Sequence, residues 1–183
     1  MTSNRFPAAL ALLAVTGVSS VAFAHPGHVS GLAHPLTGLD HLLAALCVGI
    51  IAMQRRDAWR LPVTFTLSML AGMVLASLLP ALPGVELGVA GSVLVLGLLA
   101  ATAAKLPQAA VAATVGGFAL LHGHAHGTEG AGLTYVAGIA FTTLALHFTG
   151  VGLALAARRL PGALDRAAGA AIAATGAALL IAL

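Results

Sequence analysis

The sequence predicts an all-α membrane protein, a bundle of about six transmembrane helices that follows a cleavable N-terminal signal peptide. Composition is the first observation: 60% of the 183 residues are apolar and 7% are charged, with a mean hydropathy of +1.04. About a quarter of the residues in a soluble domain are charged. Length is the second, because 183 residues accommodate six or so spans of about 20 residues each. The basic excess then reflects membrane topology, and no nucleic-acid partner is expected.

Residues 1–24 have the organisation of a secretory signal peptide. Arg5 supplies the positive n-region, an apolar stretch follows, and Ala-Phe-Ala at 22–24 forms a small-residue cleavage site. Cleavage there would leave residues 25–183 as a six-helix transmembrane domain. The alternative is that this segment remains as an uncleaved first helix.

Six hydrophobic segments follow, and the charges between them predict the orientation of the chain. The expected spans are 36–53, 61–79, 86–104, 108–126, 132–157 and 167–183. Every Lys and Arg beyond the signal segment lies in or beside the first, third and fifth connections, and none lies in the second or fourth. Because cytoplasmic connections carry an excess of basic residues, both termini of the mature chain are expected in the periplasm. The predicted signal peptide requires the same orientation.

Seven of the eight histidines fall in two clusters at the outer ends of predicted spans. The first cluster contains His25, His28, His34 and His41 with Asp40, and the second contains His122, His124 and His126 with Glu129. Glu86 opens the third span on the same side. Imidazole and carboxylate are intermediate metal ligands, and polar groups within a membrane are costly enough to indicate function. The sequence therefore predicts that a divalent metal ion meets the membrane at its outer face.

Spacing within the first cluster leaves two roles open for its carboxylate. His34 and His41 are two helical turns apart and lie nearly on one face, unless Pro35 lets His34 fold over the mouth of the helix. Thr37-Gly-Leu-Asp40 matches a capping box. Asp40 therefore either caps the helix, attracts a cation, or does both.

In the second cluster, the number of imidazoles that can converge depends on where the helix ends. His122 and His126 share one helix face, whereas His124 points the other way in a continuous helix. If Gly123 and Gly127 loosen the last turn, all three imidazoles could converge instead.

Four further side chains inside predicted spans have both a packing interpretation and a chemical one. His147 lies about 20 Å from the outer end of the fifth span, either as an interhelical hydrogen-bonding group or as a deeper station on an ion path. Met69 and Met73, one turn apart, favour packing over ligation. Cys47 is the single cysteine, so an internal disulfide and a thiolate-rich site are excluded.

These features together resemble the HupE/UreJ family of small nickel permeases over essentially the whole chain. The resemblance rests on His34-x5-Asp40-His41, on His122-Gly-His-Ala-His-Gly-Thr-Glu129 and on Pro83-Gly-Val-Glu86. It implies that the ion is handled by His34, Asp40, His41, Glu86, His122, His126 and Glu129. His124 occupies a variable position of the motif, and Leu121 stands where the family usually has Phe.

The resemblance implies an inner-membrane permease that imports Ni²⁺, or Co²⁺, from the periplasm and supplies hydrogenase or urease maturation. Such a protein is not an enzyme and holds no prosthetic group; its partners are the metal ion and the lipid bilayer, and a homo-oligomer is left open. The chain shows no nucleotide-binding motif, so direct coupling to ATP hydrolysis is not expected. The alternatives are a membrane metalloenzyme or a periplasm-facing metal-binding or sensing protein that uses the same histidines.

Overall fold

A computed structural model describes residues 30–160 and 163–183, and within these ranges all the regular secondary structure is helical, without strands. The helices are α2 (His34–Thr37), α3 (Leu39–Gln54), α4 (Arg60–Leu78), α5 (Val85–Thr102), α6 (Gln108–Glu129), α7 (Leu133–Ala157) and α8 (Leu164–Ala182). The six long helices coincide with the six predicted segments to within a few residues, which confirms the all-α fold class. The predicted signal peptide, His25 and His28 lie outside the described residues.

Four of these helices are long and apolar enough to cross a membrane, namely α4, α5, α7 and α8. They contain 18 to 25 residues each, so the chain is a multi-pass membrane protein. The other two long helices do not meet both requirements. Helix α3 is apolar but has only 16 residues, whereas α6 has 22 residues and carries three histidines near its end. That α3 and α6 also cross the membrane remains the prediction from sequence.

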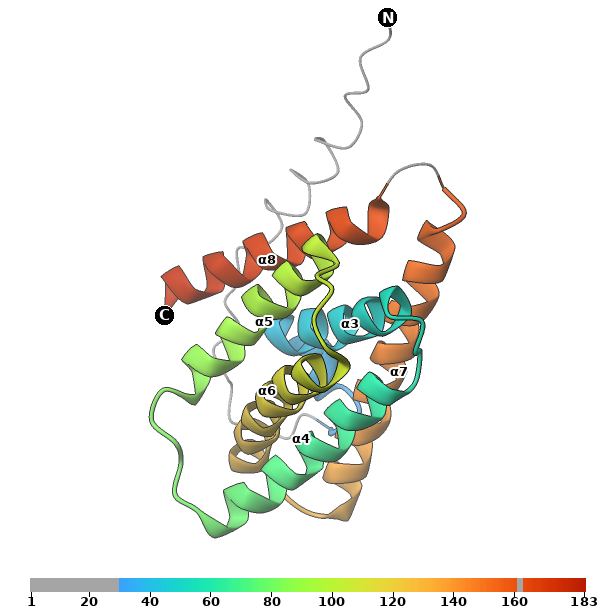
Figure 1. The fold of residues 1–183 in the computed structure, drawn as a ribbon. Helices are drawn as coiled ribbons and strands as arrows, with labels where there is room; N and C mark the ends of the chain where they lie inside the picture. The colour runs from blue at the N-terminus through green and yellow to red at the C-terminus, as the bar shows by residue number, and fades with distance from the viewer. Residues whose placement is uncertain (1–29, 161–162) are drawn as a thin grey trace, which may run out of the picture.

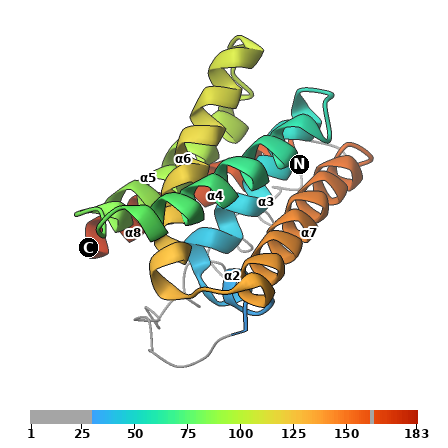
Figure 2. The same cartoon turned by 90° about the horizontal axis from the view of Figure 1, so that it is seen from below.

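The long helices pack as three close pairs, α4 with α6, α5 with α8, and α3 with α7. Helix α3 lies centrally and also contacts α4, α5 and α8 (Figures 1 and 2). Each pair meets at glycines, because a Cβ built there would overlap the backbone of the partner helix; these glycines are Gly72 and Gly123, Gly97, Gly169 and Gly176, and Gly49 and Gly150. Small residues at helix contacts are typical of membrane bundles, where close backbone approach drives association.

Gly123 provides a direct test of this packing. Its missing Cβ would overlap the backbone carbonyl of Met69 in α4, so Gly123→Ala must push the two helices apart. We expect a loss of about 1–3 kcal/mol, as for other overpacked interiors, measured as a lower thermal unfolding midpoint in detergent. Gly117→Ala is the matched control, because it lies on the same helix with no atom within 4 Å of its built Cβ. Equal midpoints for the two variants would contradict the close approach.

The end of the bundle opposite the histidine clusters is held together by basic side chains. The Arg55 guanidinium, just past α3, donates to the Gln108 side chain at the start of α6 over 2.8 Å and to the Leu106 carbonyl. Arg166 of α8 donates to the carbonyl of Ala101 in the last turn of α5 over 2.8 Å. Cations beside the last carbonyls of a helix satisfy groups that lack partners within it and complement the helix dipole. Basic residues and ligand-type residues therefore occupy opposite ends of α3 and α6.

Candidate metal centre

Three imidazoles converge where the first residues of α2 and α3 meet the last turn of α6. His34, His41 and His126 each offer one ring nitrogen, and these three nitrogens lie within 4.8 Å of one another. The ring centroids are 4.2 Å apart for His41 and His126, and 5.0 Å apart for His34 and His126. Three nitrogens spread evenly around one ion, each at about 2.1 Å from it, are about 3.6 Å apart. A contraction of about 1 Å between the most distant nitrogens would therefore let all three bind the same ion.

The Asp40 carboxylate fixes the orientation of the His41 ring. Its Oδ1 accepts the backbone N–H of His41 and lies 2.8 Å from His41 Nδ1. With Nδ1 protonated and donating to the carboxylate, Nε2 carries the lone pair, and this buried nitrogen has no hydrogen-bond partner among the described residues. Carboxylate–histidine pairs of this kind orient ligands and raise their basicity in metal sites.

The capping-box interpretation of Asp40 is wrong. Helix α3 begins at Leu39 with Gly38 at its N-cap, and no side chain caps it. Thr37 instead ends α2, where its hydroxyl donates to the carbonyl of His34 over 2.9 Å. The extended backbone at Gly38 separates the two helices, so His34 folds over the mouth of α3 on a turn of its own. Asp40 still lies in the first turn of α3, where the helix dipole favours a negative charge.

Glu129 links the two histidine clusters. Its Oε2 lies 2.7 Å from His34 Nε2 and 3.6 Å from His126 Nδ1. Tyr135 closes the same region from α7, since its hydroxyl donates to the His126 carbonyl over 3.5 Å and its ring centroid lies 6.2 Å from that of His34. Sequence analysis singled out Glu129 but did not connect Tyr135 with the site.

One turn deeper on α6, His122 extends the cluster into the bundle. Its ring is buried and its centroid lies 4.8 Å from that of His41. Its Nε2 is 2.8 Å from the hydroxyl of Ser92 in α5, which itself donates to the carbonyl of Val89 over 2.6 Å. Because the single hydroxyl proton goes to Val89, Ser92 accepts from His122 Nε2–H, which leaves Nδ1 with the lone pair. Ser92 was missed from sequence, although a hydroxyl within the apolar third span was a signal for it.

The remaining predicted ligands lie apart from this cluster. Glu86 is exposed in the first turn of α5, without an ion pair among the described residues. Helix α6 continues unbroken to Glu129, so His124 points away from His122 and His126, and neither of its buried ring nitrogens has a hydrogen-bond partner in the described chain. His147 is buried in α7, and its role is considered below.

Comparison with known proteins shows which family the chain belongs to. The family model described as HupE / UreJ protein matches residues 13–179. The chain belongs to the HupE/UreJ family. Protein HupE of Rhizobium leguminosarum bv. viciae is 41% identical over 181 residues, which cover 92% of this chain and 95% of that protein. No solved structure matches the chain.

HupE/UreJ proteins are transporters of the nickel/cobalt type and not enzymes, which confirms the resemblance seen in the sequence. In this HupE/UreJ chain, the two histidine-rich stretches supply the converging residues. The first stretch contributes His34, Asp40 and His41, and the second contributes His122, His126 and Glu129. The third stretch, which ends at Glu86, does not join them.

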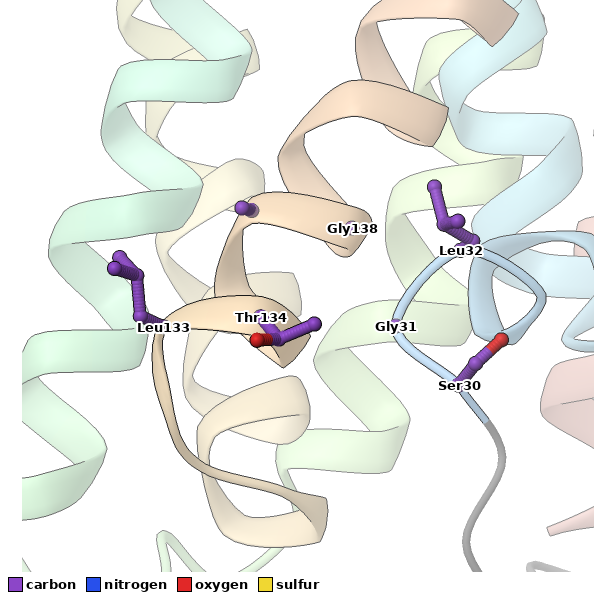
Figure 3. Close-up of a pocket in the computed structure, with 7 residues that line it drawn as sticks. Ser30, Gly31, Leu32, Leu133, Thr134 and Gly138 are labelled. Carbon is purple, nitrogen blue, oxygen red and sulfur yellow. The ribbon is translucent and has the colours of Figure 1, made fainter.

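A cavity of about 460 Å³ lies beside the candidate metal centre of this HupE/UreJ chain, between the turn before α2 and the first turns of α7 (Figure 3). Ser30, Gly31, Leu32, Leu133, Thr134, Ala137 and Gly138 line it, so it offers neither imidazole nor carboxylate. The turn is held against α7, because Thr142 donates to the Leu32 carbonyl over 2.9 Å and Gly138 leaves room for the backbone of Gly31. This anchoring positions His34 over the site.

Proposed function

We propose that this protein is an inner-membrane permease that carries Ni²⁺, or Co²⁺, from the periplasm to the cytoplasm. The observation that supports it best is the convergence of ring nitrogens from His34, His41 and His126 within 4.8 Å at one end of an apolar helical bundle. In this proposal the outer site captures the ion and replaces part of its hydration shell. Passage through the bundle follows.

The charges at the outer site suit a divalent cation. Asp40 and Glu129 together carry two negative charges beside the imidazoles, which would offset the charge of the ion in an apolar environment where an unpaired charge is costly. The basic side chains gather at the opposite end of α3 and α6. The capturing residues in this proposal are His34, Asp40, His41, His122, His126 and Glu129.

Three other predicted ligands lie outside this capturing set. Glu86, exposed at the start of α5, attracts cations toward the mouth, and His147 is a deeper station. His124 is retained as a predicted ligand without a contact to support it. Nitrogen and oxygen donors bind Cu²⁺ more tightly than Ni²⁺ or Co²⁺, so the choice of nickel comes from the family.

The proposed orientation places both mature termini in the periplasm, following the predicted signal peptide and the basic connections. A supply role for hydrogenase or urease maturation is proposed from the family resemblance alone.

Uptake of radioactive Ni²⁺ by purified protein in liposomes tests the function. A permease fills the liposomes in a saturable manner without added ATP. Tight Ni²⁺ binding without net flux would favour the alternative of a metal-binding or sensing protein. Liposomes without protein, and liposomes with the His126→Ala variant, are the controls for leakage.

Uptake should weaken as the outside is acidified. Imidazole must be neutral to bind metal, and an ordinary imidazole has a pKa of about 6.5. At pH 5.5 protons therefore compete with the metal at imidazoles that are in contact with water, whereas at pH 7.5 they do not. We expect slower initial Ni²⁺ uptake at pH 5.5 than at pH 7.5 at limiting metal and constant driving force. Equal rates would indicate that carboxylates and backbone carbonyls capture the ion instead.

A further inference from the structure

A single phenyl ring lies against two imidazoles below the outer site. Phe65 of α4 is buried, with 2% of its surface exposed. Its ring centroid lies 5.6 Å from that of His122 and 4.9 Å from that of His147. His122 belongs to the outer cluster, whereas His147 lies deeper, in α7. The phenyl ring of Phe65 therefore lies against both His122, the innermost imidazole of the outer site, and His147, the buried imidazole beyond it.

The His147 ring is fixed in place but keeps one nitrogen free. Its side chain is fully buried, and Nδ1 donates to the carbonyl of Ala45 in α3 over 2.8 Å. That hydrogen bond sets the tautomer, so the lone pair is on Nε2, which has no hydrogen-bond partner among the described residues. A purely structural histidine would be expected to satisfy both nitrogens, since an unpaired buried acceptor is destabilising. The free lone pair is suited to binding a cation.

The contact between α4 and α7 places a second pair of side chains one turn away. Met69 follows Phe65 by one helical turn, and Thr143 precedes His147 by one turn. The Thr143 hydroxyl donates to Met69 Sδ over 3.8 Å. The α4–α7 contact therefore presents a thioether, a hydroxyl and an imidazole around the phenyl ring. Imidazole and thioether donors suit Ni²⁺ and Co²⁺ far better than Mg²⁺.

We propose that Phe65 is a gate between the outer imidazoles, ending at His122, and an inner cation-binding station at His147, and that this ring determines which cations pass. The inference rests on the proposed transport function. With the ring in place, a hydrated cation meets an apolar barrier between the two imidazoles. A cation with high affinity for imidazole can exchange part of its water for His122, and then move to His147 Nε2 as the ring rotates. Mg²⁺ binds imidazole poorly, so neither nitrogen compensates it for lost water and it is held back.

Flux measurements on Phe65 variants in liposomes test the gate. Phe65→Ala should leave Ni²⁺ binding by calorimetry within about twofold of wild type, because the outer ligands remain. It should raise Mg²⁺ influx at least about tenfold, so that the ratio of Ni²⁺ to Mg²⁺ flux falls. Phe65→Leu fills most of the space and should give an intermediate ratio. Phe141→Ala is the matched control, since that ring is 69% exposed on α7 and its removal should leave the ratio unchanged.

Access to the inner station can be measured without transport. The His147→Cys variant is made in a Cys47→Ser background, which removes the single native cysteine. A small cationic thiol reagent added outside intact cells should label it slowly. Adding Phe65→Ala should raise the labelling rate at least about tenfold, and adding Phe141→Ala should not.

The outcomes separate the gate from the transport function. Wild-type protein that binds Ni²⁺ but moves none would overturn the proposed function and the gate with it. Wild-type protein that moves Ni²⁺, combined with unchanged ion ratios in both Phe65 variants and an unchanged labelling rate with Phe65→Ala, would overturn the gate alone. Loss of Ni²⁺ flux in monodisperse Phe65→Leu protein with intact Ni²⁺ binding would also overturn it, because making a barrier smaller cannot stop flux.

Discussion

Replacing His126 with alanine should abolish nickel uptake at limiting metal while the protein still accumulates in the membrane. His126 is central to the outer site, with its ring centroid 4.2 Å from that of His41 and 5.0 Å from that of His34. Its Nδ1 also lies 3.6 Å from the Glu129 carboxylate. Loss of an outer-sphere partner already costs a metal site about 10- to 100-fold, so loss of a ligand should cost about 100-fold or more. Initial rates of radioactive Ni²⁺ uptake in cells measure the effect.

Two neighbouring positions on the same helix make this test specific. Thr128→Ala is the matched control, because its hydroxyl is exposed and donates to the Ala125 carbonyl of its own helix. That variant should transport normally. His124→Ala tests the predicted ligand that the structure directs away from the cluster, and a small effect would show that His124 is not needed to capture the ion. If His126→Ala and Thr128→Ala transport equally well, the three-histidine site does not capture the ion.

The helical fold could be predicted from sequence because apolar runs, the turns between them and the charge distribution are local signals. The ends of a helix could not be predicted where two local sequence signals competed. The first predicted span began at residue 36, but Gly38 divides that region into α2 and α3. The capping-box pattern at Thr37 and Asp40 was misleading for the same reason, since a four-residue motif does not indicate whether the chain makes one helix or two.

The convergence of the two histidine clusters followed from topology, because both were predicted at the same membrane face. The individual contacts could not follow, because they depend on how each helix is rotated about its axis. Ser92 meets His122, and Phe65 meets both His122 and His147, only in the observed arrangement of α4, α5, α6 and α7. The direction of the His124 side chain depends on whether Gly123 and Gly127 interrupt α6. The spacing of apolar residues along the sequence does not predict such an interruption.

The role of Asp40 is the second large effect that can be tested. Its Oδ1 receives two hydrogen bonds from His41, one from the backbone and one from the ring, each 2.8 Å long. In Asp40→Asn the amide oxygen can still accept both, but the charge is lost. If the carboxylate acts only on the helix terminus, the variant should lose about 1 kcal/mol or less and retain transport. If the charge offsets the cation and keeps His41 Nε2 basic, the protein should accumulate normally while uptake collapses.

We expect the second result, because hydrogen bonds to an ionised acceptor are about twice as strong as neutral ones and a divalent ion needs compensating charge in an apolar site. Asp165→Asn is the matched control: it removes one carboxylate charge at the opposite end of the bundle, where an amide oxygen can still accept from Gln54 over the present 3.0 Å. Asp40→Glu separates charge from position, since it keeps the charge but moves it by one methylene. Partial rescue by Asp40→Glu would assign the effect to charge, and no rescue would assign it to the orientation of His41. Near-normal uptake by Asp40→Asn at limiting metal would show that neither is needed, and that Glu129 alone compensates the captured ion.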